Sequence, residues 1–419
     1  MQIQNSKISL LDIIVSISSL IDLVSPILTG HHNRVTYISS KIIEAMQLPK
    51  DVQNDIIIAS LLHDSGALSL NERIETLKFE DQHAARHAEM GYRLLKNFSR
   101  FERAAQIIRH HHLRWNYGAC EFCDMDQIHI GSHIIHLADR VDCLIDTNSN
   151  IVNQTDDIQS IIKKHSGSVF SPELVEAFLS VSSKEAFWLD TVHNPDIIFS
   201  GLDLGCLSMD SDEFMDIAAI YKRIIDFRSK FTSTHSSGVA AVAEFLGKIS
   251  KIPDESCRLF KVSGYLHDLG KLAIPSEILE KPGKLTKAEI NIMKGHTYYS
   301  YHILKKVRGF EVINTWSSFH HEYLNGKGYP FGLKGDDLSI GSRILGVADI
   351  FTAITEDRPY RKGMKTMQSL NILDSMAKNN QIDAEIVNIL INNFDMVNYI
   401  RRQSQAEALV EYNAFLRDK

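Results

Sequence analysis

Apolar residues along this chain recur every three or four positions, which is the spacing of helices with one buried face. Between residues 8 and 28 the large apolar side chains follow this spacing, and similar stretches end at residues 62 and 266, each directly before a His-Asp pair. A sustained alternation of polar and apolar residues, the mark of a half-buried strand, does not occur in the sequence. The pattern therefore predicts an all-α fold.

The apolar N-terminal segment, residues 8–28, could be mistaken for a signal peptide or a membrane span. Asp12 and Asp22 interrupt it, no basic stretch precedes it, and no A-x-A-like cleavage site follows it. A membrane span needs about 20 mostly apolar residues, and two acids make this segment costly in lipid. We therefore expect a half-buried first helix and no membrane span, and the five cysteines in 419 residues favour a reducing cytoplasm.

The chain repeats itself at a nearly constant offset of 204 to 210 residues. A near-constant offset across so many elements indicates an internal duplication. The sequence therefore predicts two tandem helical-bundle domains, residues 1–208 and 209–419. The matched residues are His31 and His235, His63 and His267, Asp64 and Asp268, His87 and His296, His111 and His320, His112 and His321, and Asp139 and Asp349.

Length and charge narrow the classes of function. A chain of 419 residues suffices for two or three domains with real cores, and the repeat sets the number at two. With 45 basic and 52 acidic side chains the net charge is −7, so broad electrostatic binding to a nucleic-acid polymer is not expected. Of the 19 histidines, ten fall at matched positions of the repeat, which indicates a site rather than scattered residues.

The second-half set, five imidazoles and two carboxylates, exceeds what one four-coordinate zinc ion binds. It suits two neighbouring divalent first-row ions with Asp268 between them, and mixed nitrogen and oxygen ligands favour iron or manganese. Two such ions usually share a hydroxide, which attacks a phosphorus centre. A single histidine in a helix is more often a packing or surface residue than a ligand, but seven His and Asp residues repeated in order do not fit that interpretation.

Two motifs carry a resemblance to a known family. HDLGK at 267–271, followed by HHEYLNGKGYP at 320–330, resembles the HD-GYP subgroup of the HD-superfamily phosphohydrolases over about residues 231–364. The resemblance implies tandem HD-type domains and hydrolysis of a cyclic dinucleotide in bacterial second-messenger signalling. The substrate would be chiefly cyclic di-GMP or, in members with an incomplete first domain, 3',3'-cyclic GMP-AMP. The expected product is a linear dinucleotide with a 5'-phosphate.

The resemblance also implies roles for individual residues. The seven second-half residues are expected to bind the metal ions, Lys271 to contact the scissile phosphate, and Arg358 and Arg361 to contact substrate. Lys271 follows His267 by four residues, which would place its ammonium on the same side of a helical turn. Tyr329 could stack on a base or hydrogen-bond to it. The alternatives are a solvated loop for the arginines and a tight turn for the GKGYP sequence.

The sequence departs from the subgroup at two positions. Asn325 stands where the commonest motif has Asp, which bears on substrate preference. Phe231 stands four residues before His235, where a three-metal subgroup supplies a Glu ligand, so we expect two ions rather than three.

The first half keeps the ligand set but has lost the residues that would handle substrate. Ala67 stands at the position of Lys271, and Asn148 and Ile151 stand at the two arginine positions; Leu113 replaces Glu322, and the sequence ACE at 119–121 replaces GYP. This half is expected to be either a metal-holding regulatory or dimerisation module, which would allow a homodimer, or an inherited fold whose histidines only pack.

Two other functions stay open at this stage. One is an HD phosphohydrolase that acts on another nucleotide, such as a dNTP or a guanosine alarmone; the GYP sequence and the two arginines argue against it. The other is a sensor that binds a cyclic dinucleotide or a partner protein without turnover, which the complete second-half ligand set disfavours.

Overall fold

The computed structural model describes residues 7–23, 30–67, 84–116, 128–208, 211–226, 230–358 and 361–417, apart from the side chains of residues 84, 230–233, 416 and 417. The ACE sequence at 119–121 and the side chain of Phe231 lie outside the described residues. In the part of the chain that is described, no helix is both long enough and apolar enough to cross a membrane.

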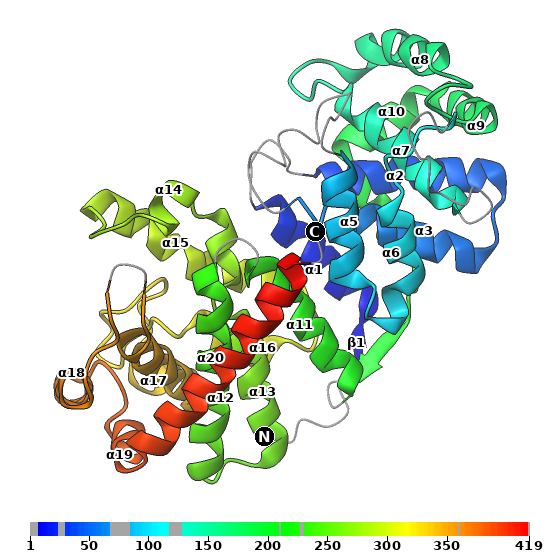
Figure 1. Ribbon diagram of the computed structural model, residues 1–419. Coiled ribbons are helices and arrows are strands. Elements are labelled where there is room, and N and C mark those ends of the chain that lie inside the picture. The colour runs from blue at the N-terminus through cyan, green and yellow to red at the C-terminus, as the bar shows by residue number, and fades with distance from the viewer. Residues whose placement is uncertain are drawn as a thin grey trace. The chain divides into compact units, whose positions relative to one another are not determined.

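The chain divides into two compact units (Figure 1). The N-terminal unit is Ile17–Gly205, and the C-terminal unit is Cys206–Lys419 together with Met1–Ser16. This division differs from the predicted halves at two places, because the described residues up to Ser16 belong to the C-terminal unit and the boundary between the units falls after Gly205 rather than after residue 208. Strand β1 (Lys7–Ser9) pairs antiparallel with β2 (Cys206–Ser208), and these are the only strands in the described ranges.

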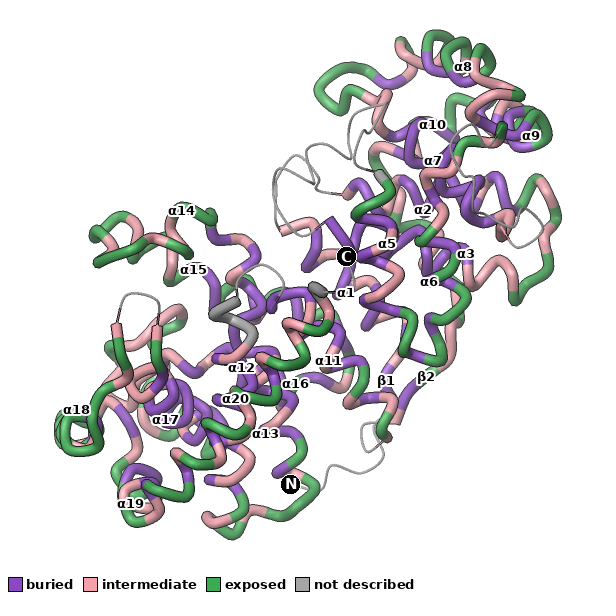
Figure 2. The backbone as a smooth tube through the Cα atoms, in the orientation of Figure 1, coloured by how far each residue is buried: buried purple, intermediate pink, exposed green. Residues whose placement is uncertain are grey.

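The N-terminal unit is a bundle of helices in which α2 packs against α3, α7 and α9. Helix α7 is buried on all sides, from residue 131 to residue 142, and appears purple along its length in Figure 2. Helix α1 (Leu10–Asp22) begins in the C-terminal unit and ends in this one. The other helices are α2 (His31–Met46), α3 (Lys50–Leu62), α5 (Ala84–Leu95), η2 (Ser99–Phe101), α6 (Glu102–Arg109), α7 (Ile130–Cys143), η4 (Ile151–Gln154), α8 (Thr155–Lys164), α9 (Pro172–Ser182), α10 (Glu185–His193) and η5 (Pro195–Phe199).

The C-terminal unit is a second helical bundle, built around α12, which packs against α13, α17 and α20. Its helices are α11 (Asp212–Asp226), α12 (Lys230–Ile249), α13 (Asp254–Leu266), η6 (Leu269–Ala273), α14 (Ser276–Leu279), α15 (Lys287–Leu304), α16 (Glu311–Ser318), η7 (Gly335–Asp337), α17 (Ile340–Thr355), α18 (Thr366–Lys378), α19 (Ala384–Asn392) and α20 (Phe394–Arg417). The predicted all-α fold is confirmed.

Two glycines allow the close helix contacts on which the site in the C-terminal unit depends. A Cβ on Gly264 would overlap the backbone of Ala240, so glycine at this position lets α13 lie directly against α12. A Cβ on Gly270 would overlap the carbonyl of His296, so glycine there lets η6 lie against α15. Because backbones approach this closely only where a side chain is missing, these glycines bring the ligand-bearing ends of the elements together.

Candidate metal centres

The structure brings all seven predicted ligands of the C-terminal unit together from five elements. Six of them are buried, and the His321 side chain is 25% exposed. The contributing residues are His235 on α12, His267 and Asp268 at the end of α13, His296 on α15, His320 and His321 after α16, and Asp349 on α17.

Three of these histidines are held in one and the same way. His267, His296 and His320 each place Nδ1 against the carbonyl oxygen three residues earlier in the chain. Since a carbonyl can only accept, Nδ1 carries the proton and Nε2 keeps a lone pair. All three Nε2 atoms are buried and find no hydrogen-bond partner among the described residues. The acceptors are the carbonyls of Gly264, Met293 and Ser317, at 2.7, 2.7 and 2.6 Å.

The two carboxylates lie among these nitrogens. Asp268 Oδ2 is 3.2 Å from His267 Nε2, and Asp268 Oδ1 is 3.4 Å from His296 Nε2. Asp349 Oδ1 is 3.0 Å from His235 Nε2, while its Oδ2 is 3.8 Å from His321 Nδ1. Each aspartate therefore has one oxygen toward each side of the cluster, as expected of ligands that serve two neighbouring ions.

Two groups of ligand atoms in this unit could each hold a metal ion, since the atoms of each group lie within 4.8 Å of one another. The groups are His235, His267 and Asp268, and His296, His320 and His321. Buried imidazole nitrogens without hydrogen bonds fit a metal ion well, because an unsatisfied buried polar atom is otherwise costly. The residues present thus fit the metal centre that the sequence predicts, while the number and identity of the ions stay predictions.

For His296, His320 and Asp268 the pKa shifts favour the protonation states that bind metal. Burial lowers the pKa of His296 to about 3 and holds the pKa of His320 well below its usual range. Burial would raise the pKa of Asp268, but His267 and Lys271 outweigh it and hold this pKa well below its usual range. Neutral imidazoles and an ionised carboxylate are the forms that coordinate a cation.

His235 differs from the other histidines because a carboxylate, not a carbonyl, holds its Nδ1. Glu356 Oε1 lies 3.1 Å from this nitrogen. Glu356 in turn accepts a hydrogen bond of 2.9 Å from Gln405 on α20, and Gln405 accepts one of 2.5 Å from the buried Arg401. Burial lowers the pKa of His235, but Glu356 and Asp349 outweigh it and raise it to about 10.

Glu356, Gln405 and Arg401 were not predicted from the sequence as parts of the site. A signal for Glu356 was present, because it follows Asp349 by seven residues and so falls on the same helical face. No comparable signal exists for Gln405, which lies 49 residues farther along the chain.

Lys271 lies at the site, but not on a continuous α-helix as its spacing from His267 suggested. Helix α13 ends at Leu266, and Lys271 lies in the 3₁₀ segment η6. Its ammonium donates to Asp268 Oδ2 at 2.6 Å, and the side chain is 22% exposed. Because a 3₁₀ helix has three residues per turn, the Lys271 side chain lies on the same side as Asp268, three residues earlier.

Tyr329 is held beside the site by a loop that Glu322 closes. The Tyr329 ring lies 4.9 Å from that of His321, and Lys294 Nζ lies 5.2 Å from its centre. The buried Glu322 carboxylate accepts the backbone N–H groups of residues 331, 332 and 333, at 2.6, 3.2 and 3.0 Å. The replacement of Glu322 by Leu113 in the first half was the sequence signal for this role.

The two predicted substrate arginines follow α17 in the chain, and their guanidinium groups bind different partners. Arg358 donates to Glu356 Oε1 at 3.0 Å, next to the residue that holds His235. The backbones of Arg358 and Arg361 exchange hydrogen bonds of 2.8 and 3.1 Å, while the Arg361 guanidinium donates to the carbonyl of Ala353. Arg358 is thus adjacent to the cluster, and Arg361 is turned back onto α17.

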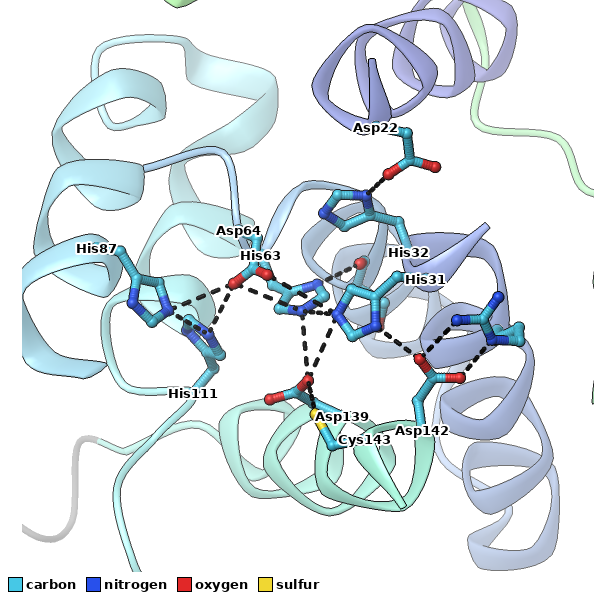
Figure 3. A network of polar contacts seen from close by, with 12 residues as sticks. Asp22, His31, His32, His63, Asp64, His87, His111, Asp139, Asp142 and Cys143 are labelled. Carbon is cyan, nitrogen blue, oxygen red and sulfur yellow. Dashed lines mark hydrogen bonds and ion pairs between the residues drawn. The ribbon is translucent and has the colours of Figure 1, made fainter. Parts of the chain in front are cut away.

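The N-terminal unit brings its own seven residues together in the same manner, as Figure 3 shows for most of them. His63 and His111 place Nδ1 against the carbonyls three residues earlier, at 2.8 and 2.6 Å. Ligand atoms within 4.8 Å of one another form two groups that could hold a metal ion. The groups are His31, His63 and Asp64, and Asp64, His87, His111 and His112.

The N-terminal cluster also has its own carboxylate and cations. His31 Nδ1 lies 2.7 Å from Asp142, which Arg34 holds at 2.5 and 3.0 Å. Arg140 donates to Asp139 Oδ2 at 2.7 Å, and its side chain is 2% exposed. Neither arginine was predicted from the sequence.

Fold and site together define a class of protein: a tandem of similar helical bundles, each with buried His and Asp groups that could hold a metal ion. A model of the HD domain family matches the chain twice, over residues 16–174 and 219–386. The chain belongs to the HD domain family, and the predicted internal duplication is confirmed by the two matches.

Some similar proteins match most of this chain, and others match about a third of it. The 3'3'-cGAMP-specific phosphodiesterase 1 of Vibrio cholerae is 30% identical over 386 residues, 87% of this chain and 87% of that protein. The cyclic di-GMP phosphodiesterase PA4108 of Pseudomonas aeruginosa is 37% identical over 142 residues, 34% of each chain. The crystal structure of a cyclic GMP-AMP-specific phosphodiesterase of V. cholerae (V-cGAP3) has the same fold, with a TM-score of 0.65 at 23% identity over 96% of this chain and 98% of that one.

Proposed function

We propose that this protein is a metal-dependent phosphodiesterase of the HD-GYP subgroup that hydrolyses a cyclic dinucleotide, 3',3'-cGAMP or cyclic di-GMP, in its C-terminal unit. The product would be a linear dinucleotide with a 5'-phosphate. The observation that carries the proposal is the set of buried Nε2 atoms on His267, His296 and His320 that lack hydrogen-bond partners among the described residues. Similarity to proteins named as phosphodiesterases of these two substrates supports the substrate class.

The seven C-terminal ligands would hold two divalent first-row ions, iron or manganese. When bound, such ions lower the pKa of an attacking water and neutralise the charge that develops on the phosphate. Asp268 would lie between the two ions, because its oxygens face His267 on one side and His296 on the other.

The other side chains would bind and orient the substrate. Lys271, half-buried beside Asp268, offers an ammonium to a phosphate oxygen. Tyr329 presents an aromatic face beside His321 on which a base can stack. Arg358 offers a forked donor next to the cluster, whereas Arg361 would have to leave the Ala353 carbonyl before it could contact substrate.

The test is a hydrolysis assay with the full chain loaded with Mn²⁺ or Fe²⁺ and a panel of 3',3'-cGAMP, cyclic di-GMP, a dNTP and guanosine tetraphosphate. We expect cleavage of a cyclic dinucleotide and its loss in His267→Ala and Asp268→Ala. His302→Ala is the matched control, because His302 is an exposed histidine on α15. Cleavage of the dNTP or the tetraphosphate alone would indicate another phosphohydrolase, and tight binding without product would indicate a sensor.

A further inference from the structure

Four ligand atoms in the N-terminal unit have the spacing of a single four-coordinate metal site. His87 Nε2 lies 3.4 Å from Asp64 Oδ1, 3.4 Å from His111 Nε2 and 2.9 Å from His112 Nε2, and His111 Nε2 lies 3.9 Å from Asp64 Oδ1. A tetrahedral ion with bonds of about 2.0–2.1 Å holds its ligand atoms about 3.3 Å apart. The observed separations scatter around this value.

One oxygen of Asp64 points to a cation as the missing partner. Asp64 is 1% exposed, and its Oδ1 accepts no hydrogen bond from any described residue. His111, which is fully buried, donates Nδ1 to a carbonyl and so turns Nε2 toward that oxygen. In Figure 3 dashed lines join the same oxygen of Asp64 to His87 and to His111. A buried carboxylate oxygen without a hydrogen bond is costly unless a positive charge lies beside it.

Arg140 makes this cluster different from the one in the C-terminal unit. There, Asp349 turns one oxygen to His235 and the other to His321. Here, Asp139 turns Oδ1 to His31 at 3.5 Å, but its Oδ2 is held by Arg140 at 2.7 Å. The residue after Asp349 is an isoleucine, so the second unit has no such cation at that place.

Lys271 and Arg140, the positively charged side chains of the two clusters, differ in how far they are exposed. Lys271, the cation of the C-terminal cluster, is 22% exposed and lies at its edge, so it can turn toward a substrate. Arg140 is 2% exposed and lies inside its cluster. The Arg140 guanidinium repels a second divalent ion in the cluster. It also binds Asp139 Oδ2, the oxygen that such an ion would need as a ligand.

We propose that the N-terminal unit binds one divalent first-row ion, best suited to zinc, through Asp64, His87, His111 and His112, and that this ion is structural. Four protein ligands would leave no open coordination position, which is typical of structural metal sites. The buried Ala67 stands where the C-terminal unit has Lys271, so no cation is present there to contact a substrate. The ion connects the end of α3, helix α5 and the turn after α6. This goes beyond the proposed function, which concerns the C-terminal unit alone.

The test counts metal in a full chain whose two C-terminal ligand groups are both disabled, one by His267→Ala and Asp268→Ala and the other by His320→Ala. After incubation with zinc and removal of free metal, mass spectrometry of the elements should find one zinc per chain. Adding Asp64→Asn, which keeps the size of the side chain, should remove it, whereas adding His136→Gln, a change of a buried histidine outside the group, should not. Adding Arg140→Ile should raise the count toward two.

Thermal unfolding with and without zinc gives a second, independent measurement. Zinc should raise the melting temperature of the His267→Ala/Asp268→Ala/His320→Ala chain and leave that of its Asp64→Asn derivative unchanged, because only a folded site binds the ion. A folded chain that holds no zinc, two zinc ions with Arg140 in place, or an unchanged count in Asp64→Asn would each overturn the proposal. None of these outcomes depends on hydrolysis.

Discussion

His235 Nδ1 lies 3.1 Å from Glu356 Oε1, whereas the histidines at the ends of α13 and α16 and on α15 bind a carbonyl of their own segment. The N-terminal unit repeats the arrangement, with Asp142 at 2.7 Å from His31. In both units the first ligand in the chain is therefore the one held by a carboxylate. Such a carboxylate fixes the ring and raises the basicity of the nitrogen that faces the metal.

Glu356→Gln should weaken metal binding in the C-terminal unit. Loss of a carboxylate behind a ligating histidine typically costs about 10–100-fold in metal affinity, so the Mn²⁺ concentration that half-activates hydrolysis should rise by that factor. Gln405→Leu, which removes the donor to Glu356, should give a smaller rise of about 3–10-fold. Gln403→Leu is the control, because Gln403 is an exposed residue of the same helix; an equal effect in this control would contradict the assignment.

Glu322→Gln should loosen the loop that carries Tyr329. The Glu322 carboxylate accepts three backbone N–H groups, and charge-assisted hydrogen bonds of this kind are about twice as strong as neutral ones. We expect KM for the cyclic dinucleotide to rise about tenfold, because the hydrogen bonds that are weakened stabilise the ordered loop by about 1–2 kcal/mol. Metal content should not change, and a loss of bound metal would show that Glu322 supports the metal centre instead.

Lys271→Met should lower turnover and leave the metal ions in place. Removal of one group that stabilises developing charge typically lowers kcat by about 10²–10³-fold. Lys281→Met serves as the control, because Lys281 pairs with Glu289 and lies outside the cluster. Elemental analysis of the purified variants checks the metal content. A Lys271→Met protein with wild-type kcat would contradict the proposed phosphate contact.

Asp226→Asn should stabilise the protein at neutral and alkaline pH. Burial raises the pKa of Asp226 to about 7, against the partial effect of Lys222. The folded chain then holds this proton more tightly than the unfolded chain, so the wild type loses stability as pH rises from about 4 to about 7. The difference in the free energy of unfolding between the variant and the wild type should therefore grow from pH 4 to pH 8, in favour of the variant, by at most about 4 kcal/mol.

Urea unfolding at pH 4 and pH 8 measures this difference. Asp216→Asn, a change of an exposed acid on the same helix, should show no pH-dependent gain. An Asp226→Asn protein that follows the pH dependence of the wild type would mean that Asp226 is solvated in the folded chain.

Much of the candidate site could be predicted from residue types and spacing. The constant offset paired His63 with His267 and Asp139 with Asp349, and the structure brings both sets together. The family resemblance implied Lys271 at the site, and Lys271 does contact Asp268, although it lies in a 3₁₀ segment rather than on the helical turn that its spacing from His267 suggested. The roles of Tyr329 and the two arginines stay predictions.

The sequence by itself determined the fold class, the duplication and the candidate ligands, because helical spacing, repeat offsets and metal-binding residue types are local properties of a chain. Only the tertiary structure decided how each ligand is held. Gln405 reaches Glu356 because α17 and α20 both pack on α12, and Arg34 reaches Asp142 because α2 packs on α7. Such contacts depend on which helix faces meet, which no spacing along the sequence encodes.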